Sequence, residues 1–446
     1  MSAHWAVTGA ETLGTPVMAR IGLGALLRMT ARRHPDRIAL IDPADKPLWS
    51  GRPAITWTYA AAAEIVDRLA RGLRGWRLPP GSRIGLCLPG SAESALALLA
   101  VEAAGHTPCL LPVAWDEDTL VAAVQGVGVS AILTQSRLGM AAPAERICAV
   151  AARYFGLRYV AAFGPDVPDG VINLDGMVLD ERAAASNEPG AAPAHAPAGT
   201  GIVSFVAGDP GRPVHRGFGS LVAAATAHLV ATRVEPDERI LSLIGPHDLR
   251  GLATGLAAAL VSGASLETLP LFDGAAFATA LAREMPTHLV APGFLEANLA
   301  GRTLPSTLRS VGLAHRAPVR FPNRSRRPDQ ALRVEAVIET VAFDETAILS
   351  GRRGTARDLA LVLAAPERLA LPESLIAIRR DGEGRLAFWG QACACAPLHR
   401  GIPAPEPAEA WRPSPYVPVV AAGLATALVS EAGHALGTVL GSSGQA

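Results

Sequence analysis

The chain has 446 residues, half of them hydrophobic, and its 40 Lys and Arg residues balance its 40 Asp and Glu residues at a formal net charge of zero. This balance excludes a general electrostatic attraction to nucleic acid or to acidic membrane surfaces. A chain of this length exceeds one ordinary hydrophobic core, so we expect two or three subdomains.

The first third of the chain alternates helical and strand patterns. Apolar residues at helical spacing predict helices that begin near Leu26, run through Ile65–Leu73 and cover Ser91–Ala104 before Gly105. Short apolar runs predict strands ending at Ile41 and spanning Thr56–Tyr59, Arg83–Pro89 and Thr107–Val113. Strands that alternate with helices imply a mainly parallel sheet covered on both faces.

An Ala-, Pro- and Gly-rich stretch between Arg182 and Gly201 is typical of a flexible connection and indicates a subdomain boundary. The alternation then resumes, with strands expected over 201–206, 240–244, 266–271 and 287–290 and helices over 220–232 and 252–262. We therefore expect an α/β chain of two βα-type subdomains with mostly parallel sheets covered by helices. Their expected bounds are 1–190 and 198–345, followed by a small β-rich subdomain over 346–410 and a tail helix over 411–446.

The five cysteines and the hydropathy pattern bear on the compartment. An odd number of cysteines without a signal peptide favours reduced thiols in the cytoplasm. Cys393 and Cys395 are too close together for a standard zinc pair. No charge-free apolar run of about 18 residues predicts a membrane span. The tail from Tyr416 to Leu440 comes nearest, but Glu431 interrupts it, so we expect a packed terminal helix there.

The loop that follows the strand at 201–206 carries the strongest functional signal. It reads Ser204-Phe-Val-Ala-Gly-Asp-Pro-Gly-Arg-Pro-Val-His-Arg216. A glycine-rich turn after an apolar strand can direct backbone N–H groups at a phosphate, and a lysine usually completes such a cradle. Here Gly208 and Gly211 are present, but Val214 stands at the lysine position and Lys46 is the only lysine in the chain.

Together these segments resemble the large N-terminal domain of the adenylate-forming enzymes, which include acyl-CoA synthetases, aryl-CoA ligases and adenylation domains. The resemblance runs from about Leu26 to about Gly390. It is most specific in Ser91–Gln135, with a helix–glycine–strand–proline signature ending at Pro112, and in Leu271–Asp273 followed by Pro286–Pro292. It implies that the nucleotide and a carboxylic acid bind at the C-terminal strand ends, between the subdomains.

The resemblance also implies a chemistry, in which a carboxylate attacks the α-phosphate of ATP to give an acyl-adenylate, which a thiol then opens. Departing pyrophosphate carries several negative charges, so cations and N–H donors must meet it. By resemblance the phosphate-binding residues are Gly208, Gly211, Arg212 and Arg216, with either Arg212 or Arg216 as the candidate to compensate for the missing lysine. Glu345 stands at the position of the Mg²⁺-binding glutamate, and an exposed structural acid is the competing interpretation.

The acid-binding pocket is expected near His247 and Gly251, since Pro246–Leu252 resembles the motif in which a histidine or aromatic residue borders the acyl group. A histidine between a strand and a helix is also often structural. After Gly390 no Thr-Gly-Asp motif for the ribose follows. The remaining residues, about 50, are too few for the lid domain that carries the adenylation lysine.

Two hypotheses follow. The chain is either a catalytically impaired relative that keeps the acyl or adenylate cleft for binding or scaffolding, or an active AMP-forming ligase whose lid is supplied in trans. Expected ligands are ATP or AMP with Mg²⁺ and a small carboxylic acid or acyl group, and expected partners are a carrier protein or an active ligase. The arginine-rich stretch at 316–333 is interpreted as a solvated loop, with nucleic acid or a phosphorylated partner as the alternative. The chain lacks a Gly-x-Ser-x-Gly elbow and a dinucleotide fingerprint.

Overall fold

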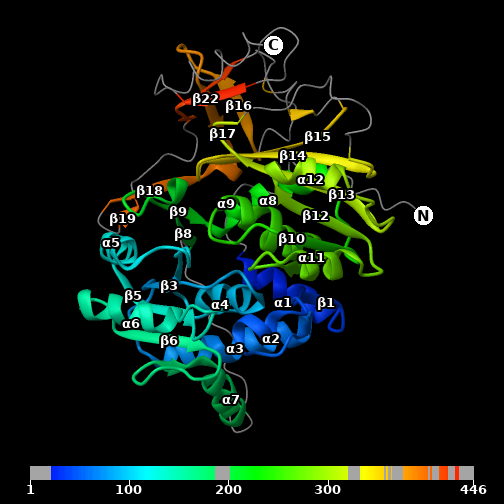
Figure 1. Ribbon diagram of the computed structural model, residues 1–446. Coiled ribbons are helices and arrows are strands. Elements are labelled where there is room, and N and C mark those ends of the chain that lie inside the picture. The colour runs from blue at the N-terminus through cyan, green and yellow to red at the C-terminus, as the bar shows by residue number, and fades with distance from the viewer. Residues whose placement is uncertain are drawn as a thin grey trace.

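Two large β-sheets, each covered by helices, form most of the protein (Figure 1). The computed structural model describes residues 22–185, 201–319, 332–355, 358–359, 363, 375–399, 402–403, 411–419 and 427–430. The expected α/β class with mostly parallel, helix-covered sheets is confirmed. Among these residues no helix is both long and apolar enough to cross a membrane.

The first sheet has nine strands in the order β19-β18-β9-β8-β4-β3-β5-β6-β7. The run from β8 to β7 is parallel, and β9, β18 and β19 extend it by antiparallel pairing. The strands are β3 (Arg83–Leu86), β4 (Thr107–Leu110), β5 (Val129–Gln135), β6 (Tyr159–Phe163), β7 (Ile172–Asn173), β8 (Gly201–Phe205), β9 (Pro213–Gly217), β18 (Cys395–His399) and β19 (Ile402–Pro403).

The second sheet has eight strands in the order β15-β14-β13-β12-β10-β11-β1-β2, with only the outermost pair at each edge antiparallel. Its six parallel strands β14, β13, β12, β10, β11 and β1 therefore have their C-terminal ends at one common edge. The strands are β1 (Ile38–Ile41), β2 (Thr56–Thr58), β10 (Arg239–Ser242), β11 (Ser265–Thr268), β12 (Thr287–Pro292), β13 (Leu308–Arg316), β14 (Ala336–Phe343) and β15 (Ala347–Arg352).

The division between the sheets differs from the expected one. The early strands β1 and β2, expected in a subdomain over 1–190, belong to the second sheet. The phosphate-loop hairpin β8–β9, expected in a subdomain over 198–345, belongs to the first. The reason is strand pairing. β1 finds a parallel partner in β11, and β8 finds one in β4, so neighbours in a sheet are not neighbours in sequence.

Several of the helices that pack on these sheets lie at positions that the hydrophobic spacing predicts. The expected helix at 91–104 is α4, preceded by Ser91 as its N-cap residue, and the expected helix at 252–262 begins with a π-helical turn at Leu252–Leu256. The helices are α1 (Leu23–Arg33), α2 (Lys46–Ser50), α3 (Tyr59–Gly75), α4 (Ala92–Ala103), α5 (Glu117–Val127), α6 (Pro143–Arg153), α7 (Leu174–Ala185), α8 (Phe218–Thr232), α9 (Leu249–Gly251), α10 (Ala257–Ser262), α11 (Gly274–Leu281) and α12 (Glu296–Ala300).

One hydrophobic core joins the two sheets. It includes Leu69 and Leu73 of α3, Leu96 of α4, Leu221 of α8 and Leu256 of the π-helical turn, all of them almost completely buried. Helix α4 is buried on every side, which explains why its sequence is apolar all round rather than amphipathic. The contact between the sheets is therefore part of the core and not a loose domain boundary.

Short strands above the second sheet form the β-rich region expected after residue 346 (Figure 1): β16 (Ala377–Arg380), β17 (Leu386–Trp389) and β20 (Arg412–Pro413). The expected tail helix is wrong for the residues described there. Tyr416–Val419 (β21) and Ala427–Ser430 (β22) pair as antiparallel strands, because Pro418 and the β-branched residues beside it disfavour a helix. The arginine-rich stretch lies mostly in 320–331, outside the described residues.

The only lysine, Lys46, lies in α2 and is fully buried. Its Nζ donates to Asp42 Oδ2 at 2.6 Å and to Glu93 Oε1 at 2.5 Å, and Arg52 Nε reaches the same Glu93 oxygen at 2.9 Å. This network joins the N-terminal segment to the start of α4. Lys46 therefore has a structural role, because its ammonium group is bound by two buried carboxylates.

We predict that Lys46→Met destabilises the protein by about 3–5 kcal/mol, because it leaves two buried carboxylates with one cation fewer. Urea unfolding followed by circular dichroism measures this loss. The matched control is Arg153→Met, which removes an exposed ion pair with Asp118 and is expected to cost less than about 1 kcal/mol. Equal losses in the two variants would contradict the structural role of Lys46.

Candidate functional site

The candidate site lies at the C-terminal edge of the second sheet, where loops after parallel strands meet. His247 follows β10, Arg316 ends β13 and Glu345 follows β14. The loop after β8 of the first sheet reaches the same place, since Ser204 Oγ donates to Glu345 Oε2 at 2.6 Å. Open α/β folds bind ligands at such edges, which makes this the place to test the expected residues.

The phosphate-like loop is a short 3₁₀ turn (Val206–Gly208) followed by the exposed residues Gly211 and Arg212. Gly208 has a φ of 75°, a conformation that glycine adopts without strain. Asp209 Oδ1 accepts a hydrogen bond from the Gly211 N–H at 2.8 Å. A loop that already satisfies its own N–H with its own carboxylate is poorly suited to a phosphate, because the carboxylate would repel it.

Val214, at the lysine position, lies inside β9 and is buried. It is paired with Ser204 of β8 on one side and with Pro397 of β18 on the other. The strand is therefore interior to the sheet, and the Val214 side chain, which points out of the plane of the sheet, is buried on one of its faces. A buried position of this kind suits an apolar residue.

Glu345 is almost completely buried, and both of its interactions are internal. Its carboxyl group accepts from Ser204 Oγ and from the Leu249 N–H at 3.1 Å. Burial, followed by the negative charge of Asp248, raises the pKa of Glu345 to about 8. At neutral pH this side chain is mainly the uncharged acid.

Arg216, one of the two arginines expected to compensate for the lysine, is buried and directed into the protein. Its guanidinium donates to Ser220 Oγ and the Ala392 carbonyl, each at 2.6 Å, to the Thr346 carbonyl at 3.1 Å and to the Glu345 carbonyl. These acceptors come from α8, from the turn after β14 and from the region after β17. Arg216 thus fixes three segments at the site, while Arg212 is exposed on the loop.

Asp248 is a central residue that sequence reasoning missed. Its Oδ1 caps α9 by accepting the N–H groups of Arg250 and Gly251, and its Oδ2 accepts from Arg250 Nη2 at 2.8 Å and Arg316 Nη2 at 2.6 Å. Burial acts to raise its pKa, but the charges of Arg250, His247 and Arg316 outweigh it, so the pKa lies below the ordinary value. An Asp directly before a helix is a capping signal, and that signal was available in the sequence.

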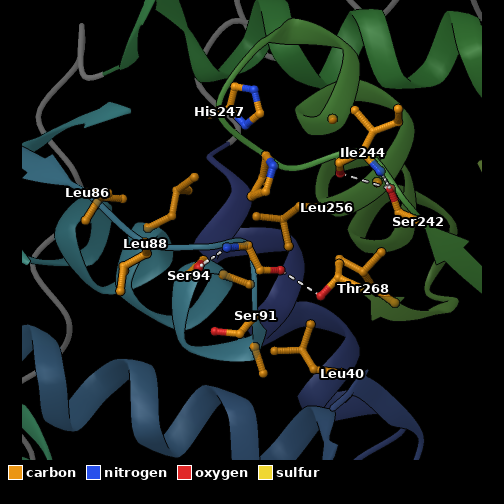
Figure 2. A pocket seen from close by; sticks show the side chains of 18 of the residues that line it. Leu40, Leu86, Leu88, Ser91, Ser94, Ser242, Ile244, His247, Leu256 and Thr268 are labelled. Atoms are coloured by element: carbon orange, nitrogen blue, oxygen red, sulfur yellow. Dashed lines mark hydrogen bonds between the residues drawn. The ribbon is translucent and has the colours of Figure 1, made fainter. Parts of the chain in front are cut away.

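His247 and Gly251 border a small apolar cavity between the two sheets (Figure 2). Its volume is about 30 Å³, room for about two water molecules. In Figure 2, His247 lies at the side of the cavity opposite Leu40. The Gly90 N–H donates to Ser94 Oγ of α4 at 2.9 Å, and the Gly90 carbonyl accepts from Thr268 Oγ1 of β11 at 2.6 Å. The structure brings these two expected substrate residues together, and their role in binding stays a prediction.

The residues around Glu345 do not fit a magnesium ion. Mg²⁺ takes accessible oxygen ligands and keeps several waters, whereas this carboxyl group is buried and already hydrogen-bonded to Ser204 and the Leu249 N–H. Within the described ranges there is no group of three His, Cys, Asp or Glu side chains that could hold a metal ion. The phosphate loop adds no lysine and contributes an acid.

Comparisons with known proteins concern the family and the fold. The sequence model of a family described as AMP-binding enzyme matches residues 27–320. The salicyl-AMP ligase / salicyl-S-ArCP synthetase of Mycobacterium tuberculosis is 38% identical over 88 residues, 20% of this chain and 15% of that protein. Phosphinothricin tripeptide synthetase PhsC of Streptomyces viridochromogenes is 29% identical over 306 residues, 66% of this chain and 24% of that protein. The chain thus matches less than a quarter of the length of each of these relatives.

Among solved structures, the anthranilate CoA ligase AuaEII in complex with anthranoyl-AMP superposes with a TM-score of 0.69 at 14% sequence identity. The match covers 92% of this chain and 78% of that one. At this identity the likeness concerns the fold. It places the same two-sheet architecture in a protein that holds an aryl adenylate.

We predict that Gly251→Ala destabilises the protein by about 1–3 kcal/mol, because a Cβ there would lie 1.9 Å from the Gly245 carbonyl oxygen. The matched control is Gly255→Ala in the same helical segment, where the nearest atoms lie 3.8 Å away and alanine favours the helix. Thermal unfolding of both variants measures the difference. A Gly251→Ala protein as stable as the control would contradict the close approach of the two segments.

We predict that Glu345→Gln changes the pH dependence of stability. The pKa of Glu345 is about 8 in the folded chain and near 4.5 when exposed, so the folded state holds a proton that the unfolded state has lost between these values. Stability of the native protein therefore falls as pH rises through this window, by up to about 1.4 kcal/mol per pH unit from this group. Glutamine keeps both hydrogen bonds and does not titrate.

The test is urea unfolding of both proteins at pH 5.5, 6.5 and 7.5. Relative to the wild type, the Glu345→Gln variant is expected to gain stability steadily as pH rises. The other titrating groups are common to both proteins and cancel in the difference. A difference that is constant over pH, or that falls, would show that Glu345 is ionised in the folded state.

Proposed function

The chain belongs to the AMP-binding enzyme family, and we propose that it is a member that no longer forms adenylates and keeps the strand-end cleft for binding an acyl or aryl group. The observation that carries the proposal is the internal use of Glu345. A metal-binding acid must be ionised and open to solvent, whereas this one is buried against Ser204 and the Leu249 N–H.

The phosphate loop supports the same proposal. Pyrophosphate departure needs cations and free N–H donors in place before the reaction. Here the lysine position holds Val214, whose side chain is buried, Asp209 accepts the Gly211 N–H, and Lys46 is held in a buried network elsewhere. No lysine remains in the chain for the step.

The ligand class follows from the relatives. Two of them are named for salicyl and anthranoyl groups, so we propose a small aryl or acyl acid as the ligand of this chain. The name salicyl-S-ArCP synthetase also points to a carrier protein, and we propose a carrier or an active ligase as partner. In this role the protein holds or presents an acyl group and a partner supplies the chemistry.

We predict that Val214→Lys alone does not produce adenylation, because the acid, the loop and the ribose contacts are unchanged by it. The assay is ATP–pyrophosphate exchange with salicylate, anthranilate and benzoate, for the wild type and the variant. Both are expected to stay at background. Appreciable exchange by the variant would contradict the proposal, and exchange by the wild type would establish an active ligase whose cation comes from elsewhere.

A thermal-shift titration with Mg-ATP, AMP and a non-hydrolysable aryl-adenylate mimic accompanies this assay. A ligand that binds only the folded state raises the unfolding temperature by mass action. The proposal expects a saturable shift with the mimic and none with Mg-ATP. A saturable shift with Mg-ATP would contradict it.

A further inference from the structure

Two arginines at the site share one carboxylate oxygen. Arg250 Nη2 and Nε lie 2.8 Å and 3.2 Å from Asp248 Oδ2, and Arg316 Nη2 lies 2.6 Å from the same atom. The other oxygen of Asp248 is held by the backbone N–H groups at the start of α9. Asp248 is therefore fixed, and it holds two guanidinium groups side by side.

The charges in this cluster do not balance. Arg216 is buried nearby, and its hydrogen bonds go to carbonyl groups and the Ser220 hydroxyl. The second acid of the cluster is Glu345, which is buried and accepts hydrogen bonds from Ser204 Oγ and the Leu249 N–H. Even with both acids ionised, the three guanidinium groups outnumber the carboxylates, and a positive charge in a partly dry place attracts an anion strongly.

The charged groups on either side do not remove this excess. On one side Asp344 accepts a hydrogen bond from Tyr416 at 2.8 Å, and the exposed Arg212 lies in the same region. On the other side Glu339 is engaged with His315 and Arg353. With Arg212 and Asp344 counted as well, the four arginines of this region still outnumber its three acids, Asp248, Asp344 and Glu345.

The surplus charge is reachable from solvent. The side chains of Arg250 and Arg316 are 21% and 26% exposed, while Asp248 beneath them is 3% exposed. His247, also exposed, lies next to them at the border of the cavity between the sheets. An anion can therefore approach the two guanidinium groups from outside while its apolar part turns toward this border.

We propose that Arg250 and Arg316, oriented by Asp248, form an anion-binding pair that takes the free carboxylate of an aryl or acyl acid. This inference rests on the proposed function and deepens it, since the ligand is then bound as the charged acid and not as an uncharged ester or amide. Guanidinium groups match a carboxylate through paired, charge-assisted hydrogen bonds. A phosphate group forms the same kind of hydrogen bonds with guanidinium groups, so the test compares carboxylic acids with inorganic phosphate.

The test is isothermal titration calorimetry of the full chain at pH 7 with matched probes. Benzoate and salicylate are compared with benzamide and salicylamide, which have nearly the same shape without the charge, and with inorganic phosphate. We expect the acids to bind at least about tenfold more tightly than their amides, the usual effect of a charged hydrogen bond. Phosphate alone, which lacks the aryl body, is expected to bind more weakly than either acid.

The variants Arg316→Gln and Arg250→Gln remove one guanidinium each and leave the other to pair with Asp248, so both are expected to fold. Each should weaken binding of the acids at least about tenfold and leave amide binding unchanged. Arg302→Gln is the matched control. Arg302 is an exposed arginine between α12 and β13, and it precedes the strand that Arg316 ends. It should leave acid binding unchanged.

Equal affinity for acids and amides, acid binding that survives both variants, or no binding of any acid would each overturn the anion-binding pair. Phosphate binding tighter than that of the acids, and lost in the same variants, would overturn the carboxylate as its ligand. None of these results affects the pyrophosphate-exchange assay. The proposed function would fail through ATP–pyrophosphate exchange by the wild type, so its failure is distinguishable from failure of the anion-binding pair.

Discussion

The arrangement of the site depends on one buried cation, the guanidinium of Arg216. It starts from β9 of the first sheet and reaches carbonyl groups after β14 of the second sheet and after β17 of the β-rich region. Few other side chains can satisfy acceptors in three separate segments at once, because the guanidinium offers five N–H donors in a fixed plane. Its presence sets where the turn at 344–346 lies, and so where Glu345 points.

Once that turn is fixed, the neighbouring groups follow from electrostatics. Glu345 is placed beside Asp248 in a poorly solvated region, and two acids so close cannot both ionise easily. Asp248 has the better partners, two guanidinium groups and a helix N-terminus, so it keeps the charge and Glu345 keeps the proton. The position at which relatives of this family are expected to hold a metal is thereby turned into a neutral, internal hydrogen-bonding group.

Polar groups elsewhere in the molecule are also bound by internal partners. The phosphate-like loop closes on its own aspartate, and Lys46 neutralises two buried acids at the start of α4. What stays accessible is the rim of the strand ends, with His247 and the two guanidinium groups on Asp248. Under the function that we propose, these cations bind an anionic ligand and do not assist the departure of pyrophosphate.

Much of the fold was determined by the sequence alone. Apolar spacing located α4, α8 and the strands β8, β10 and β12, because burial of a hydrophobic face requires that spacing whatever the partner. The sequence also shows that Val214 stands where a lysine is expected, because the identity of a residue can be established without a structure. The sequence did not predict which strands pair with one another. Strand β1 and the hairpin β8–β9 each belong to the other sheet than expected, and β21 and β22 pair where a helix was expected.

For the site, resemblance to family motifs identified His247, Gly251, Arg216 and Glu345 as candidates from the sequence alone. Only the tertiary structure decided what each one contacts. Whether an arginine faces a ligand or three carbonyl groups, and whether a glutamate is charged, depends on neighbours more than a hundred residues away. Local sequence encodes the spacing of apolar residues and turns, whereas charge state and hydrogen-bond partners are set by long-range packing and the dielectric that it creates.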